Sequence, residues 1–169
     1  MEIRAEKASD KENIAALTYC AFENHPHHEP GAKPTEHLIV DRLRKANMLA
    51  LSLVCEDDNN IIGHIAFSPI LINGEQSTWY GLGPLSVTPE RQGEGIGSAL
   101  IHFGLSQLKA QGIEGVVLLG EPQYYARFGF ESQPNLTFAG VPAEYFMAKA
   151  LANNIPTGEV GYHSAFFES

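Results

Sequence analysis

A glycine-rich loop that reads QGEGIG, from Gln92 to Gly97, is the first candidate site in the sequence. It follows an apolar run that reads LGPLSV and precedes a helix-like run that begins near Ser98. The first amides of a helix have no intrahelical partners, and the helix dipole favours an anion at that end. Glycines also let the backbone approach a bound group closely. The loop therefore predicts a phosphate-binding site at the start of a helix.

Two familiar phosphate-binding loops fit this segment poorly. A P-loop needs a lysine directly after its last glycine, and none follows here. A dinucleotide fingerprint has the pattern GxGxxG/A, but the sixth position counted from Gly93 or Gly95 is serine or leucine. Glu121, an acid at the end of the next apolar run, is the feature that favours a dinucleotide. The pattern that fits is QxxGxG, beside the alternative of a turn without any ligand.

The motifs of this chain, taken in order, resemble the GNAT superfamily of acetyl-CoA-dependent N-acetyltransferases, and most of all its YhbS-like bacterial branch. The stretches that carry the resemblance are LGPLSVTPERQGEGIGSAL and LGEPQYYARFGF. The stretches IRAEKASDKENIAAL, IIGHIAFSP and GEVGYHSAF support it, so the likeness covers nearly the whole chain. The resemblance implies an enzyme whose cosubstrate is acetyl-CoA.

The resemblance also implies which residues bind coenzyme A. The loop amides would hold its pyrophosphate, and the strand before the loop would pair with its pantetheine arm. The implied cofactor-binding residues are Leu85, Ser86, Val87, Gln92, Gly93, Glu94, Gly95, Ile96, Gly97 and Ser98. A backbone amide near Leu85 would polarise the thioester carbonyl. Arg91 is either an added charge near the phosphates or a solvated loop residue.

Tyr125 is the catalytic residue that the resemblance implies, because the family's general acid is the tyrosine of a YxxxGF motif, here YARFGF. The role is chemically reasonable, since a thiol has a pKa of about 8.5 and a departing thiolate benefits from a nearby proton. The alternative is an aromatic core residue whose hydroxyl merely finds a partner. Tyr124 is expected to pack in the core or to form part of the cofactor wall.

The general base is not evident in the sequence. Many members of the family carry an acid on the strand before the loop, and LGPLSV has none. Many also carry an asparagine where this chain has Glu121, which puts that cofactor contact in doubt. Deprotonation of the amine is therefore expected to run through water, with Glu121 or His64 as weak candidates.

Histidines and cysteines suggest two further kinds of site. The segment HPHHEP, residues 25–30, has metal-ligand residue types, but the adjacent His27 and His28 converge poorly on one ion and no second cluster is evident, so no metal is expected. In the resemblance this segment borders the acceptor pocket, so a role in substrate gating is more plausible. Cys20 and Cys55 would be needed for a ping-pong route, but both are expected to be buried, inert thiols.

The elements that position these residues follow from periodicity and turn signals. Ser9 and Glu12 have the spacing of a capping box at a helix start, and Asn73 with Gly74 indicates a tight hairpin. The predicted elements are a strand at 2–6, a helix ending near Phe22, a helix from about Thr35, an antiparallel meander over 49–87, a helix over 98–111, a strand at 115–119, a short helix at 122–128, a helix over 141–151 and a last strand at 159–167. This is a mixed α+β fold with a central, mostly antiparallel sheet and helices on both faces, in one domain over residues 1–169.

Composition narrows the function classes. The net charge of −9 weighs against a nucleic-acid binder, which needs clustered Lys and Arg. No apolar run is long enough to span a membrane and no leader is visible, so we expect a cytoplasmic protein, monomeric or homodimeric.

The leading hypothesis is acetyl transfer to a small-molecule or protein primary amine by direct attack in a ternary complex. An acyl-CoA-binding sensor module is the alternative, and a dinucleotide oxidoreductase is remote.

Overall fold

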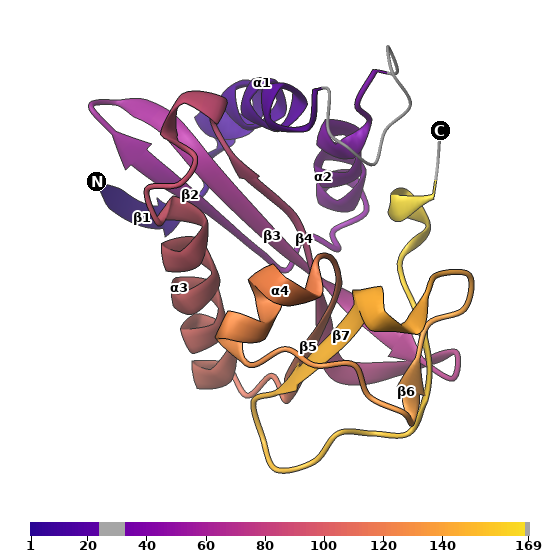
Figure 1. Ribbon diagram of the computed structural model, residues 1–169. Coiled ribbons are helices and arrows are strands. Elements are labelled where there is room, and N and C mark those ends of the chain that lie inside the picture. The colour runs from indigo at the N-terminus through magenta and orange to yellow at the C-terminus, as the bar shows by residue number, and fades with distance from the viewer. Residues whose placement is uncertain (24–32, 168–169) are drawn as a thin grey trace.

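The computed structural model describes residues 1–23 and 33–167, and its strands form a twisted sheet flanked by helices (Figure 1). The strands are β1 Glu2–Ala5, β2 Leu51–Asp57, β3 Asn60–Ile72, β4 Glu75–Val87, β5 Gly115–Leu119, β6 Leu136–Thr137, β7 Phe146–Ala150 and β8 Gly158–Gly161. The helices are α1 Lys11–Phe22, α2 Glu36–Lys45, α3 Ile96–Ala110 and α4 Pro122–Tyr125. Within the described residues, no helix has the length and apolar character needed to cross a membrane.

The sheet is mostly antiparallel, as the sequence predicts. Its strand order is β1-β2-β3-β4-β5-β7, and β8 pairs with β3 and β6. The β4–β5 pair is parallel, whereas β1–β2, β2–β3, β3–β4 and β5–β7 are antiparallel. A parallel pair needs a crossover connection, and α3 supplies it between β4 and β5.

Helices cover both faces of the sheet because its strands alternate their apolar side chains. On one face, Leu53 of β2 packs in the same cluster as Leu100 and Ile101 of α3. On the other face, the neighbouring residue Val54 packs against Ile14 of α1 and Val40 of α2. Successive residues of a strand point to opposite faces, so one strand contributes to two apolar cores.

Two tight turns fix the register of the central meander. Asn73 and Gly74 have φ of 53° and 77°, and Asp58 and Asn59 have φ of 50° and 66°. Two successive positive φ angles are the requirement of the hairpin turn that matches strand twist, and Asn, Asp and Gly tolerate it best. The predicted hairpin at Asn73–Gly74 and the meander that it joins are therefore confirmed.

The prediction of a helix over residues 141–151 is wrong. A 3₁₀ turn at Ala143–Tyr145 leads into strand β7, whose residues pair with β5 from Phe146 against Leu119 to Ala150 against Gly115. Phe146 and Met147 are buried in the two different apolar cores. Pairing at the edge of the sheet outweighs the helix propensity of the local sequence, which is a weak preference. The C-terminal segment likewise ends its strand at Gly161 and continues as a 3₁₀ turn, Ser164–Phe166.

The start of α1 differs from the predicted capping box. Ser9 lies inside a 3₁₀ turn, Ala8–Asp10, that precedes the helix. The Asp10 carboxylate accepts the backbone N–H of Lys7 at 2.7 Å and pairs with Arg4 at 2.8 Å. The acidic residue therefore fixes the entry to α1, and Ser9 does not.

The sheet opens between β4 and β5, and this divergence positions the site. The two strands pair only from Trp79 against Gly115 to Gly81 against Val117. β4 continues to Val87 beyond the last of these pairs. One edge of its final residues is therefore left without a strand partner, directly before the glycine loop.

Candidate active site

The final residues of β4 present backbone groups to the open edge of the sheet. The Thr88 N–H donates to the Ile62 carbonyl of β3 at 2.9 Å. Residues of an antiparallel strand alternate between bonding a given neighbour and facing away from it. Ser86 therefore turns its backbone groups toward β3, and Leu85 and Val87 turn theirs to the open edge. The Gln92 side chain confirms this direction, because its Nε2 donates to the Val87 carbonyl at 3.1 Å.

Two positions of the glycine loop have a backbone conformation that favours glycine. Gly93 and Gly95 both have φ of 85°, the left-handed region that other residues adopt only with strain. Gly97 serves a different purpose, since a Cβ there would lie 2.8 Å from the Tyr124 hydroxyl. The three alternating glycines thus allow two left-handed turns and one close approach of a side chain.

The glycine loop leads directly into the N-terminus of α3. Gly95 is the residue before the helix, and Ala99 makes the first helical bond, its N–H donating to the Gly95 carbonyl at 3.0 Å. The amides of Ile96, Gly97 and Ser98 come before that bond, so they have no intrahelical acceptor. The helix begins two residues earlier than predicted, which places these amides within the glycine loop.

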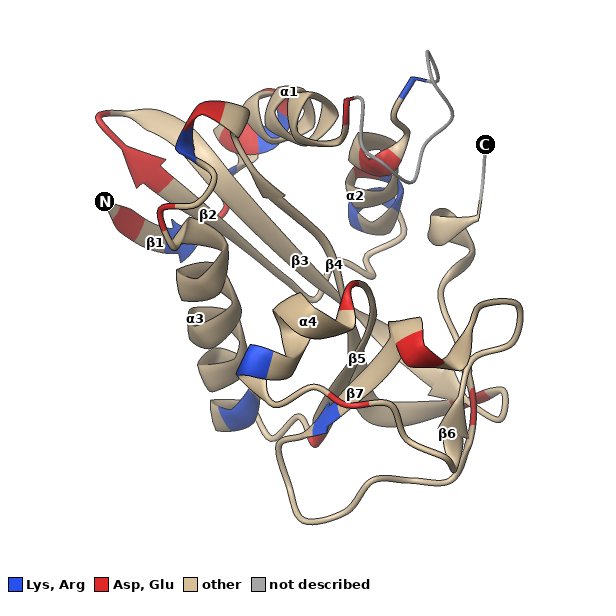
Figure 2. Ribbon diagram, in the orientation of Figure 1, with Lys and Arg blue, Asp and Glu red and all other residues tan. Residues whose placement is uncertain are grey.

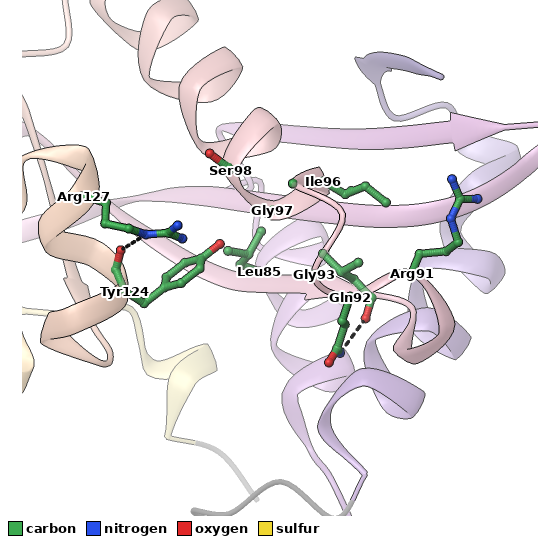
Figure 3. Close-up of a pocket in the computed structure, with 11 residues that line it drawn as sticks. Leu85, Arg91, Gln92, Gly93, Ile96, Gly97, Ser98, Tyr124 and Arg127 are labelled. Carbon is green, nitrogen blue, oxygen red and sulfur yellow. Dashed lines mark hydrogen bonds between the residues drawn. The ribbon is translucent and has the colours of Figure 1, made fainter.

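These elements enclose a first cavity of about 540 Å³, called the cradle cavity below (Figure 3). Its lining residues are Leu85, Val87, Arg91, Gln92, Gly93, Gly95, Ile96, Gly97, Ser98, Tyr124 and Arg127. Most of the predicted cofactor-binding residues therefore line one cavity. Ser86 and Glu94 do not: the buried Ser86 hydroxyl donates to Thr18 on the opposite face, and the exposed Glu94 carboxylate pairs with Arg91.

Two arginines flank the cradle cavity. Arg91 is held by Glu94 at 2.9 Å and by Asp57 at 3.1 Å, so part of its charge is already compensated. Arg127 lies with its guanidinium 4.6 Å from the centre of the Tyr124 ring and donates to the Tyr124 carbonyl at 3.2 Å. Sequence reasoning missed Arg127. The available signal was its place three residues after Tyr124, which puts both on one side of a helical turn.

A second cavity of about 800 Å³, called the transfer cavity below, adjoins the first. Leu85, Val87, Gln92 and Tyr124 line both cavities. Most of the other walls of the transfer cavity come from the end of α1, from the part of β4 before Leu85 and from the end of β5 with the two residues after it. These segments supply residues 20–23, 82–84 and 119–121. The two cavities therefore form one path along the open edge of β4.

Tyr125 lines the transfer cavity and lies in an aromatic cluster. Its ring contacts Phe128 and Phe130, with ring centres 6.4 and 6.1 Å away. Gly120 makes room for it, because a Cβ at that position would lie 2.4 Å from the tyrosine ring. Burial raises the pKa of Tyr125 above its ordinary value. The hydroxyl therefore keeps its proton at neutral pH.

Two carboxylates and one thiol also line the transfer cavity. Glu121, a weak candidate base in the sequence, lies on its wall together with Glu23. Cys20 lines it as well and is exposed, so the expectation of a buried thiol is wrong at this position. Cys55 is buried as expected, and burial raises the pKa of its thiol.

His64, the other candidate base, lines neither the cradle cavity nor the transfer cavity. It is fully buried in a polar network that starts at Arg44, which binds Glu6 at 2.9 Å. Ser52 donates to Glu6, so the His64 Nε2, 2.7 Å from the Ser52 hydroxyl, acts as the donor in that contact. Burial lowers the pKa of His64 to about 4. The structure thus gives His64 a place in the core.

The buried His64 should make stability depend on pH in a defined window. An unfolded histidine binds a proton below its pKa of about 6.5, whereas His64 stays neutral in the folded protein until about pH 4. The contribution of neutral His64 to the free energy of unfolding should therefore be present in full above pH 6.5. Up to about 3 kcal/mol of stability should be lost as the pH falls from 6.5 to 4. Urea unfolding at a series of pH values measures the slope.

The variant His64→Gln removes this titration, and His102→Gln is its matched control at an exposed position on α3. We expect the loss of stability from pH 7.5 to 5 to be smaller in His64→Gln than in the wild type and unchanged in His102→Gln. Equal slopes in all three proteins would contradict the buried, neutral state of His64.

The geometry of the site agrees with comparisons to known proteins. The chain matches the model of the acetyltransferase (GNAT) domain over residues 49–132. It is 36% identical over 174 residues to the N-acetyltransferase YhbS of Escherichia coli strain K12, and the match covers 98% of both chains. The chain belongs to the GNAT family of acetyltransferases. The family predicted from the QGEGIG and YYARFGF motifs is thereby confirmed.

Two solved structures of GNAT proteins resemble this acetyltransferase over almost their full length. One is a GNAT acetyltransferase from Brucella melitensis in complex with acetyl-CoA, with a TM-score of 0.85 and 46% identity over 98% of this chain and 97% of that one. The other is YhbS from Escherichia coli in complex with CoA, with a TM-score of 0.90 and 35% identity over 99% and 92% of the two chains. These likenesses confirm the predicted fold.

The HPHHEP segment, residues 25–30, lies outside the described part of this acetyltransferase. Its predicted role in substrate gating therefore stays a prediction. Among residues 1–23 and 33–167, no three His, Cys, Asp or Glu side chains gather as metal ligands would. Lys and Arg in the same ranges lie on several elements, and three of them, Arg42, Arg44 and Lys45, lie in the last turn of α2 (Figure 2).

Proposed function

We propose that this GNAT acetyltransferase transfers the acetyl group of acetyl-CoA to a primary amine, by direct attack while both substrates are bound. The observation that carries the proposal is the continuous path from the cradle cavity to the transfer cavity along the open edge of β4. The complexes of the two relatives with acetyl-CoA and CoA support the choice of cosubstrate.

The residues of the cradle cavity suit coenzyme A. The amides at the start of α3 and the left-handed glycines Gly93 and Gly95 offer N–H groups to a pyrophosphate, and the helix dipole favours its charge. Arg91 and Arg127 add positive charge at the rim. The backbone groups of Leu85 and Val87 are available for strand-like pairing with the amides of a pantetheine arm.

The chemistry that acetyl-CoA supplies is an acetyl group activated as a thioester. The Leu85 N–H faces the open edge, where it would stabilise negative charge developing on the thioester oxygen. The amine nitrogen bonds to the carbonyl carbon as the carbon–sulfur bond breaks, and the sulfur takes a proton from Tyr125. The proton of the amine leaves through water, by way of Glu23 or Glu121 on the cavity wall, and a proton from the same water restores Tyr125 to its neutral form.

A thiol-release assay with acetyl-CoA and a panel of primary amines tests the proposal. Amine-dependent release, with product mass increased by one acetyl group, is the expected result. Calorimetric titration with acetyl-CoA runs in parallel. Tight binding without release on any amine would instead favour an acyl-CoA sensor, and absence of binding would reject coenzyme A as the ligand of the cradle.

Arg127→Ala should weaken the interaction with acetyl-CoA selectively. The exposed guanidinium lines the cradle cavity, so its loss should raise the KM for acetyl-CoA by about 3- to 10-fold, which corresponds to about 1 kcal/mol for an exposed charge contact. Lys109→Ala removes an exposed cation at the other end of α3 and should leave this KM unchanged. Steady-state kinetics at low and high salt decide the point, since the difference should shrink as salt rises.

A further inference from the structure

The segment that carries Tyr125, residues 121–130 and called the tyrosine segment below, is anchored beside β7 at both ends (Figure 1). Directly before it, the Gly120 N–H donates to the carbonyl of Tyr145, the residue that precedes β7, at 3.0 Å. Directly after it, Glu131 exchanges two backbone hydrogen bonds with a residue of β7, at 2.8 and 3.1 Å. So short a helical segment is not stable alone, and its shape depends on such contacts.

The YARFGF motif ends the tyrosine segment as a Schellman motif. Gly129 has φ of 89°, the left-handed conformation that this helix end requires. The Phe130 N–H donates to the Tyr125 carbonyl at 3.4 Å, and the Gly129 N–H donates to the Ala126 carbonyl at 3.0 Å. The rings of Tyr125 and Phe130 make the apolar contact that accompanies the motif, with ring centres 6.1 Å apart. The turn that ends the helix therefore also fixes the backbone of Tyr125.

The carbonyl of Phe128 is bound from outside the tyrosine segment. Phe128 is the last residue of the 3₁₀ turn, and the last carbonyls of a helical segment have no partner within it. The Lys149 Nζ donates to this carbonyl at 2.7 Å. A cation is favoured at this end of the aligned peptide dipoles. Gly129 leaves room for it, because a Cβ there would lie 2.6 Å from the Lys149 Nζ.

Lys149 lies on the side of β7 that faces an apolar core. Its pairing partner on β5 is Val116, and side chains of directly paired residues lie on the same face of a sheet. Val116 and Met147, two residues before Lys149, both belong to the core beside α3. A lysine can cover apolar surface with its stem while its ammonium finds polar partners, and an ammonium without them would be costly here. The Phe128 carbonyl supplies such a partner.

We propose that Lys149 is a positioning residue for the transfer reaction. Its bond to the Phe128 carbonyl closes the turn at the end of the tyrosine segment and thereby holds Tyr125 in the wall of the transfer cavity. Lys149 itself lines neither the cradle cavity nor the transfer cavity, so it acts through the turn. This inference rests on the proposed function, because it concerns the residue that donates the proton there.

Hydrogen exchange tests the contact without any substrate. Lys149→Met removes the ammonium and keeps an unbranched apolar stem. The protection of the Gly129 and Phe130 amides, measured by NMR, should fall at least about tenfold, as loss of a hydrogen bond from a charged donor predicts. The amides of Gly112 and Ile113 close the same motif at the end of α3 and should keep their protection. Unchanged protection at Gly129 and Phe130 would overturn the inference.

A double-mutant cycle with Tyr125→Phe separates positioning from a general structural effect. Lys149→Met should lower kcat about 10- to 100-fold, because a small misplacement of a catalytic group is costly. In the Tyr125→Phe background the same substitution should lower kcat less than about threefold, since the proton donor is already absent. Lys109→Met removes an exposed cation and should leave kcat unchanged in both backgrounds. Equal losses from Lys149→Met in the two backgrounds would overturn the inference.

The two measurements distinguish failure of the inference from failure of the proposed function. Wild-type kcat in Tyr125→Phe would reject the general acid of the proposed function, and hydrogen exchange would then decide by itself whether Lys149 holds the tyrosine segment. Lys149→Arg retains a cationic donor and should have a kcat at least about threefold above that of Lys149→Met. Equal kcat values in these two variants would contradict the role of the donor.

Discussion

Tyr125→Phe is expected to lower kcat by about 10²- to 10⁴-fold, the usual contribution of a positioned proton donor. Tyr125 lines the transfer cavity, and burial raises the pKa of its hydroxyl, so the proton is in place at neutral pH. The substitution removes one oxygen and keeps the ring against Phe128 and Phe130. The fold should therefore be preserved, and the Kd for acetyl-CoA should change less than about threefold. Steady-state kinetics and calorimetry give the two quantities.

Tyr124→Phe is the matched control for this experiment. Tyr124 is the neighbouring residue and lines both cavities, but its hydroxyl lies beside Gly97 at the start of α3. We expect this variant to affect the KM for acetyl-CoA more than kcat. A large loss of kcat in Tyr124→Phe together with a small one in Tyr125→Phe would transfer the role of general acid to Tyr124.

Gly95→Ala is expected to raise the Kd for acetyl-CoA by about 10- to 100-fold. The residue has φ of 85°, and it ends the loop at the first amides of α3. A Cβ here favours rotation out of the left-handed region by about 1–2 kcal/mol, which would turn the loop amides away from the pyrophosphate. Loss of one charge-assisted hydrogen bond costs about 1.5–3 kcal/mol, and this sets the expected factor.

Gly112→Ala separates the loss of binding from backbone strain. Gly112 follows the other end of α3, has the same φ of 85° and likewise has no atom within 4 Å of an added Cβ. Both variants should lose similar stability in urea unfolding. Only Gly95→Ala should weaken acetyl-CoA binding, so an equal loss of affinity in Gly112→Ala would show that strain alone causes the effect.

Much of the fold was predictable because its signals are local. The hairpin at Asn73–Gly74 follows from residues that tolerate positive φ, and the buried strand β5 follows from a short apolar run. The segment 141–151 was mispredicted because its composition favours a helix, while its strand is stabilised by pairing with a distant partner, β5. Local propensity contains no information about that partner.

The candidate site divides in the same way. The sequence by itself determined the glycine loop, since left-handed φ at Gly93 and Gly95 and the free amides of a helix start depend only on adjacent residues. It also identified the family, because its motifs are short and keep a fixed order. Only the tertiary structure brought Arg127 and Tyr124 to the loop, turned Ser86 away from it, and placed His64 in the core.

The cavities beyond the glycine loop were decided by tertiary structure alone. The end of α1, the helix α2, the open edge of β4 and the C-terminal segment are far apart in the sequence and meet only in the folded protein. Each contributes one to three apolar or aromatic side chains that carry no signal on their own in the sequence. A phosphate is recognised by contiguous backbone amides, which a sequence motif can encode, whereas an apolar body is recognised by a surface that many segments assemble. The sequence therefore determined the family and its cosubstrate, and only the fold assembled the apolar walls beside the glycine loop.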